Sequence, residues 1–264
     1  MEIPTAVKAL KFRHAVAARP RPSFFVTGQP GVGKTLLLAE LALKLTGATA
    51  EDILIGEFPL DEEGAETLRD RPFTVVKLPT MEALEQTYQD FLKIKPPAVI
   101  MDNLPAAWWM AFMCRCPDGL MPEDHGKTWN KLASDVCHLT VTRFKAAPWV
   151  KFFGASSLVS PTEDAFIVAQ DSPKKGPKDE KLQTTLPGQL KGGIYGLFSY
   201  AVNIKLVNVQ GKDMRCLETR PTSNVVAKVR APLLEQPKAN IIYDLATVDR
   251  GIDYVVKELR LEGA

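Results

Sequence analysis

The chain has 264 residues, of which 45% are hydrophobic and 24% charged, so it is long enough to bury the core of one large domain. Its formal net charge of +2 excludes a polycation that binds nucleic acid over its whole surface. No apolar run approaches the roughly 18 residues that a membrane span needs, so we expect no membrane partner.

The N-terminal residues 1–22 are rich in basic side chains and lack the apolar core of a secretion signal, so we expect an N-terminal arm. The cysteines form no disulfide framework for a chain of this length, which favours a reducing cytoplasm. They are Cys114, Cys116, Cys137 and Cys216.

A strand, a glycine-rich loop and a helix follow one another. Residues 23–27 (SFFVT) predict the strand, and residues 35–45 (TLLLAELALKL) predict the helix. Between them, GQPGVGKT matches the full phosphate-binding loop pattern, in which backbone N–H groups and a helix N-terminus attract a polyphosphate. The predicted binding residues are Gly28, Gln29, Pro30, Gly31, Val32, Gly33, Lys34 and Thr35.

Two of these residues carry specific chemistry. Lys34 is expected to reach the β- and γ-phosphates of ATP, and Thr35 to ligate Mg²⁺ through its hydroxyl. Residues 97–102 (PAVIMD) predict a buried parallel strand that ends at Asp102. Asp102 is expected to hold the Mg²⁺ shell, whereas a carboxylate that caps the next turn is the alternative.

An acidic cluster follows the strand predicted over residues 53–58. In PLDEEGA (59–65), one of three acids can position the water that attacks a γ-phosphate. The same cluster fits a solvated helix start, because acids favour helix N-termini. A further strand over 73–78 and a helix over 81–94, capped by Thr80, are predicted next.

The middle of the chain is less regular. Residues 103–127 predict an irregular segment whose tryptophans and methionines suit packing better than base stacking. A helix is predicted over 128–145 and a strand over 149–155. Ser156 and Ser157 fit turn residues or a sensor of the γ-phosphate. The Cys and His residues here lack a standard zinc spacing.

Residues 165–169 and 182–186 flank the turn SPKKGPKDEK, which predicts a protruding hairpin, and a lysine-rich segment spans residues 172–191. Its five lysines oppose only Asp179 and Glu180, so it can track a nucleic-acid backbone, although a solubilising loop has the same composition. The lysines are Lys174, Lys175, Lys178, Lys181 and Lys191.

The last third predicts strands over 201–209 and 214–219, joined at Gln210 and Gly211, and a helix over 249–262. If the segment VVAKVR is extended, Lys228 and Arg230 lie on one face, where they can pair with acids or reach phosphates. Alternating strands and helices predict an α/β fold with a mostly parallel sheet flanked by helices and late antiparallel strands.

These elements together resemble the RecA superfamily of P-loop ATPases, and more closely the short RecA-like recombination ATPases that phages encode. The resemblance implies an ATPase core over residues 23–232 and a C-terminal extension over 233–264. LDEEGAETL resembles a stretch in which a glutamate activates water, which implies that role for Glu63, with Asp61 beside it. AKVRAPL resembles an element that reaches a neighbouring subunit's nucleotide, which implies that role for Lys228 and Arg230.

The resemblance implies hydrolysis of ATP with Mg²⁺, self-association as a ring or filament, and action on single-stranded DNA with a single-strand binding protein. It also implies that the protein is located in the host cytoplasm. A helicase-like motor or loader is the alternative within the class. A small-molecule kinase shares the phosphate loop, and a nucleotide-gated binding module with little hydrolysis is a third class.

Overall fold

The computed structural model describes residues 21–58, 68, 70–118, 125–160, 183–184, 186, 193–221, 226–229 and 236–261. The helices are α1 (Lys34–Thr46), α2 (Met81–Ile94), α3 (Leu104–Arg115), α4 (His125–Val136), α5 (Arg143–Ala146) and α7 (Ile252–Glu258). The strands are β1 (Ser23–Gly28), β2 (Ile53–Glu57), β3 (Thr74–Lys77), β4 (Ala98–Asp102), β5 (Phe152–Ser160), β6 (Gln183–Thr184), β7 (Tyr200–Val209), β8 (Lys212–Glu218), β9 (Lys228–Val229) and β10 (Asn240–Tyr243).

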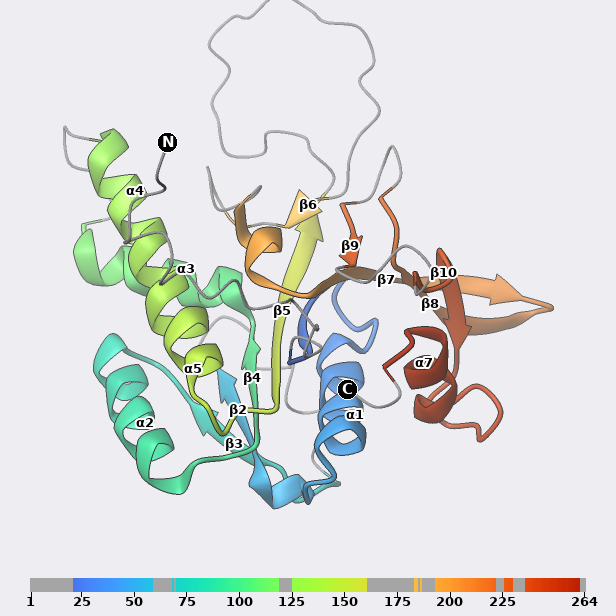
Figure 1. Cartoon of the computed structure of the whole chain (residues 1–264). Helices are drawn as coiled ribbons and strands as arrows, with labels where there is room; N and C mark the ends of the chain where they lie inside the picture. The colour runs from blue at the N-terminus through green and yellow to red at the C-terminus, as the bar shows by residue number, and fades with distance from the viewer. Residues whose placement is uncertain are drawn as a thin grey trace, which may run out of the picture.

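Eight of these strands form a sheet in the order β10-β8-β7-β1-β5-β4-β2-β3 (Figure 1), and the short strands β6 and β9 pair with β5 and β7. Strands β7, β1, β5, β4, β2 and β3 run parallel, whereas β6, β8, β9 and β10 pair antiparallel with their neighbours. The hairpin between β7 and β8 turns at Gln210 and Gly211, both with positive φ, as a two-residue hairpin requires. The predicted α/β fold with late antiparallel strands is confirmed.

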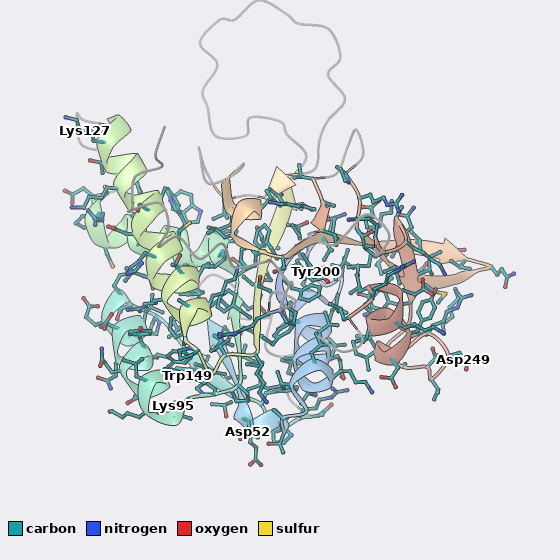
Figure 2. All side chains as sticks on the ribbon, in the orientation of Figure 1. Asp52, Lys95, Lys127, Trp149, Tyr200 and Asp249 are labelled. Atoms are coloured by element: carbon teal, nitrogen blue, oxygen red, sulfur yellow. The ribbon has the colours of Figure 1, made fainter. Side chains whose placement is uncertain are left out.

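Helices cover the two faces of the sheet unequally. α1 and α7 pack together on one face, where Phe24, Val26 and Leu38 belong to the first core cluster. The other face is covered by α2, α3, α4 and α5 (Figure 1), and the core cluster on this side contains Phe25 and Trp108. Side chains fill the space between the helices and the sheet (Figure 2). Alternate residues of β1 therefore enter opposite cores, as the period of two in a strand requires.

The prediction of an irregular segment over residues 103–127 is wrong for its first half, because helix α3 spans Leu104–Arg115. The Asn103 side chain caps this helix by accepting the Ala106 N–H at 2.9 Å, and Pro105 sits in the first turn, where no intrahelical N–H is required. Trp108 is buried, so it serves packing as predicted, while Trp109 is 41% exposed.

Other boundaries differ more modestly from the predictions. The helix expected over 128–145 is split into α4, a π-helical turn over Cys137–Thr142 and α5. The strand expected to end at residue 155 continues as β5 to Ser160, and the last helix is shorter than expected. Strand β10 was not predicted. Among the helices of the described segments, none is both long and apolar enough to cross a bilayer.

Candidate active site

The loop of residues 28–35 connects β1 to α1 at the carboxyl edge of the sheet. A Cβ at Gly28 would lie 2.6 Å from the Ile204 carbonyl oxygen, so only glycine allows this approach to β7. Gly33 has φ +89° and supplies no side-chain cap to α1. A helix that begins without a side-chain cap directs its first N–H groups toward the preceding loop, which is the arrangement of an anion site.

Three side chains predicted or considered from the sequence meet beside this loop. The Thr35 hydroxyl donates a hydrogen bond to Asp102 Oδ2, and the Ser156 hydroxyl donates to Asp102 Oδ1. All three residues are buried. Lys34 Nζ donates to the Gln29 carbonyl oxygen at 2.9 Å, which holds its ammonium group at the loop.

Sheet pairing explains how these residues meet. Asp102 ends β4, and β5 lies between β4 and β1. Met101 pairs with Ala155, so Asp102 and Ser156 are adjacent and point to the α1 face. Ser156 and Ser157 lie inside a strand, so their interpretation as turn residues is wrong.

Glu57 extends this row and was missed from the sequence. It ends β2, pairs with Asp102 and is buried, with 6% of its surface exposed. Ile55 of the same strand belongs to the core beneath α1, so Glu57 points to that face as well. Its signal was present, because a charged residue closes the apolar run ILIGE. We name Ser156, Asp102 and Glu57 the acidic row.

The oxygen atoms of Thr35 and Asp102 suit Mg²⁺, which prefers hydroxyl and carboxylate ligands from few protein groups. A hydroxyl already hydrogen-bonded to a carboxylate shows that the two groups are within reach of one small ion. The donor set therefore fits the predicted metal. Across the described residues, no group of three or more His, Cys, Asp or Glu side chains is placed to hold a metal ion.

A second buried polar row crosses the sheet on the opposite face. Thr27 Oγ1 donates to Asn203 Oδ1 at 3.1 Å, and Asn203 Nδ2 donates to Glu218 Oε2 at 2.7 Å. Lys205 donates to the other Glu218 oxygen, and this hydrogen bond raises the pKa of Lys205. Both oxygens of the buried Glu218 thus have donors. We name Thr27, Asn203, Glu218 and Lys205 the capped row.

Arg215 of β8 also reaches the phosphate loop. Its Nε–H donates to the Val32 carbonyl oxygen at 2.9 Å. Arg215 is half-buried and shares the α1 face with Leu217 of the same strand. No sequence motif points to this residue, because 183 positions separate it from Val32.

Several predicted site residues lie outside the described residues: Asp61, Glu63, Arg230 and the lysines Lys174, Lys175, Lys178, Lys181 and Lys191. Lys228 is described and half-buried in β9, where it pairs with Ala201 of β7. The extended conformation assumed for this segment is confirmed at Lys228 and Val229.

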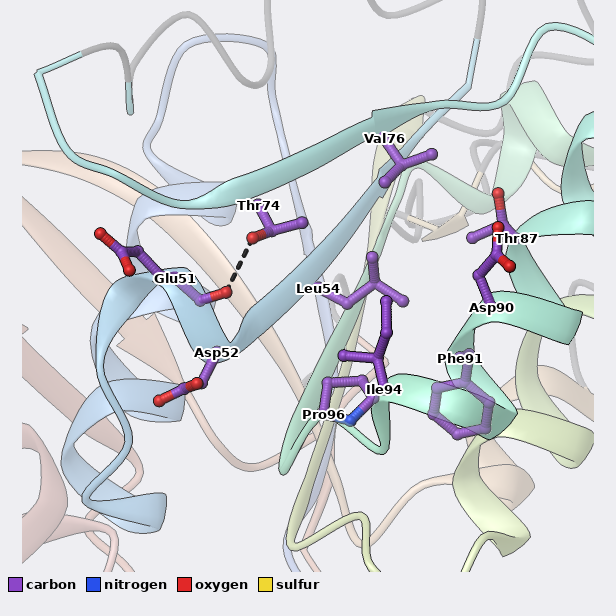
Figure 3. A pocket seen from close by; sticks show the side chains of 10 residues that line it. All are labelled: Glu51, Asp52, Leu54, Thr74, Val76, Thr87, Asp90, Phe91, Ile94 and Pro96. Carbon is purple, nitrogen blue, oxygen red and sulfur yellow. Dashed lines mark hydrogen bonds between the residues drawn. The ribbon is translucent and has the colours of Figure 1, made fainter.

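A cavity of about 250 Å³ lies between β2, β3 and α2 (Figure 3). Leu54, Val76, Phe91 and Ile94 line it, with Asp52 at its rim. Asp52 precedes β2 and Pro96 precedes β4, so the cavity lies toward the amino edge of the parallel strands. It is therefore separate from the phosphate loop, which lies at the carboxyl edge.

No protein-family model matches the chain. No curated protein matches it either. Among solved structures, the chain is similar to the crystal structure of the flagellar accessory protein FlaH from Methanocaldococcus jannaschii. The two share 12% identity at a TM-score of 0.44, and the match covers 85% of each chain. A likeness of this size says nothing of activity or partner.

Proposed function

We propose that the chain is a RecA-like P-loop ATPase that acts on single-stranded DNA in phage recombination or replication. The observation that carries the ATPase part is the meeting of Thr35, Asp102 and Ser156 beside the loop that holds Lys34. The action on DNA rests on the sequence resemblance and on the lysine-rich segment over residues 172–191.

In this proposal the loop N–H groups and Lys34 bind the phosphates of ATP. Thr35 and Asp102 hold Mg²⁺, which neutralises charge that develops on the phosphates. A carboxylate positions the attacking water. Glu63 is the candidate from the resemblance, and Glu57 is the candidate from its place in the acidic row.

The proposal includes nucleotide sites shared between subunits of a ring or filament. Lys228 pairs with Ala201, whereas Gly28 pairs with Ile204, three residues further along β7. Lys228 therefore lies on the amino side of its own phosphate loop, roughly 10 Å along the strand at 3.3 Å per residue. This offset favours a role for Lys228 at a neighbouring subunit's site, and the sequence resemblance gives Arg230 the same role.

The test of this function is steady-state ATP hydrolysis with and without single-stranded DNA, across protein concentration. We expect DNA to raise the rate and specific activity to rise with concentration, because subunits must associate to complete a site. Lys34→Ala is the control, since it removes the phosphate-binding ammonium group and any remaining activity comes from a contaminant. If the specific activity is the same with and without DNA and at every protein concentration, the DNA and shared-site parts of the proposal are wrong.

Arg230→Ala tests the shared site directly. We expect turnover to fall by about 10³-fold, the lower end of what an arginine finger contributes, while ATP affinity changes little. Mixing this variant with Lys34→Ala protein is a sharp control. Each subunit type then lacks a different half of the site, so mixed assemblies recover turnover only if sites are shared.

A further inference from the structure

Arg215 is a cation that reaches the phosphate loop from outside every motif of the sequence. It belongs to β8, which pairs with β7 and β10 in the antiparallel part of the sheet (Figure 1). Its side chain donates a hydrogen bond from Nε to the Val32 carbonyl oxygen at 2.9 Å. Val32 lies in the middle of GQPGVGKT, so the contact falls on the phosphate-binding backbone itself.

Peptide geometry gives this contact a direction. The carbonyl of Val32 and the N–H of Gly33 belong to one planar trans peptide group, so they point to opposite sides. Arg215 holds the carbonyl on one side of the loop. The Gly33 N–H must then point to the other side. Phosphate loops bind their ligand through N–H groups that point inward together.

The conformation of Gly33 makes the contact tight. A Cβ at Gly33 would lie 2.9 Å from Arg215 Nε, and φ at Gly33 is +89°. The guanidinium group therefore packs directly against the glycine backbone. Rotation of the Val32–Gly33 peptide group would break the hydrogen bond to Arg215.

We propose that Arg215 is a positioning residue that orients the Val32–Gly33 peptide group so that the Gly33 N–H faces the phosphates of bound nucleotide. This inference rests on the proposed ATPase function. Arg215 acts on the loop and not on the reacting atoms, so it sets affinity for the phosphates rather than the rate of cleavage. Nucleotide affinity then depends on the position of β8, the strand that carries Arg215.

The test compares wild type, Arg215→Met, Arg215→Lys and Arg220→Met in isothermal titration with ADP and ATP in Mg²⁺, and in thermal unfolding without nucleotide. Arg220 is the matched control, because it also donates to a backbone carbonyl, that of Pro237 at 3.3 Å, away from the loop. We expect Arg215→Met to raise Kd for both nucleotides about tenfold, the effect of one lost charged hydrogen bond. The kcat should stay near wild type at saturating ATP.

The other variants complete the test. Arg215→Lys keeps a donor and should recover part of the affinity, and Arg220→Met should bind as wild type does. Equal affinity of wild type and Arg215→Met overturns the inference. So does a lower unfolding temperature of Arg215→Met without any change in Kd, because that result marks a purely structural contact. Failure of wild type itself to bind nucleotide overturns the proposed function, and the positioning role with it.

Discussion

The sheet carries two buried polar rows, and they differ in which face they occupy. The acidic row of Ser156, Asp102 and Glu57 points to the α1 face, toward the phosphate loop. The capped row of Thr27, Asn203, Glu218 and Lys205 points to the opposite face. Both rows contain a buried carboxylate, so burial alone does not distinguish them.

The difference lies in how each carboxylate is satisfied. Glu218 accepts from Asn203 and from Lys205, whose side chain is 48% exposed and links the row to solvent. Asp102 accepts from two hydroxyl groups, one of which, Thr35, is itself a predicted metal ligand. A carboxylate fixed by an amide and an ammonium group stabilises the fold, whereas one fixed by hydroxyl groups beside a phosphate loop is suited to bind a cation.

The largest expected effect concerns Glu57. Glu57→Gln should lower kcat by about 10²- to 10⁴-fold, because the amide cannot act as a base toward water. ATP affinity should remain near wild type, since the phosphates are bound by the loop. Single-turnover hydrolysis measures this directly. Glu51→Gln is the matched control, because Glu51 is exposed just before the other end of the same strand.

Glu63→Gln belongs in the same experiment, because the sequence resemblance assigns the water-positioning role to Glu63. Loss of turnover in Glu63→Gln with normal turnover in Glu57→Gln would show that Glu63, and not Glu57, positions the attacking water.

A smaller effect is expected for Asp102→Asn. A neutral amide oxygen is a weaker ligand for Mg²⁺, so the Mg²⁺ concentration at half-maximal hydrolysis should rise at least about 10- to 100-fold. A Mg²⁺ titration of the hydrolysis rate measures the change. The control is Ser157→Ala, which removes a hydroxyl from the next position on β5, on the opposite face. If the Mg²⁺ concentration at half-maximal hydrolysis rises equally in both variants, Mg²⁺ is not held specifically on the face that Asp102 occupies.

Local sequence patterns predicted the parts of the site that lie within single elements. GQPGVGKT lies between a strand and a helix as expected, and Asp102 ends a buried strand. Short-range chemistry dictates both, because a phosphate loop needs its glycines in order and a buried parallel strand is apolar up to its carboxyl end.

Predictions failed where two signals competed. The run from Leu104 to Arg115 contains tryptophans and methionines without helical alternation, yet Asn103 and Pro105 form a good helix start. Strand β5 was expected to end before Ser156 because serines favour turns. Asp102 offers Ser156 a partner inside the sheet, so the strand continues.

Contacts between distant segments were beyond local patterns. Arg215 and Val32 meet only because β8 folds back beside β7, and Glu218 meets Asn203 through the pairing of the same two strands. Glu57 required both a strand assignment and its register against Asp102. The contacts of these residues depend on the order and register of the strands in the sheet, and no short motif encodes that order.

The smallest effect on activity is expected in the capped row. Glu218→Gln replaces an oxygen that accepts from Asn203 or Lys205 with an amide donor, so one donor loses its partner. Unfolding free energy should fall by about 1–3 kcal/mol, toward the lower end because half-exposed Lys205 can turn to water. The urea midpoint measures this loss.

ATP turnover in Glu218→Gln, measured without urea, should stay at the wild-type rate, because the capped row lies on the face opposite α1. Lys205→Met is the companion variant, since it removes the ammonium group and leaves Asn203, the cross-strand partner of Glu218, donating to Glu218 Oε2. Both variants should lose stability and retain activity. A variant of this row that keeps its stability and loses turnover would show that the two faces of the sheet are coupled through Thr27, the residue next to the phosphate loop.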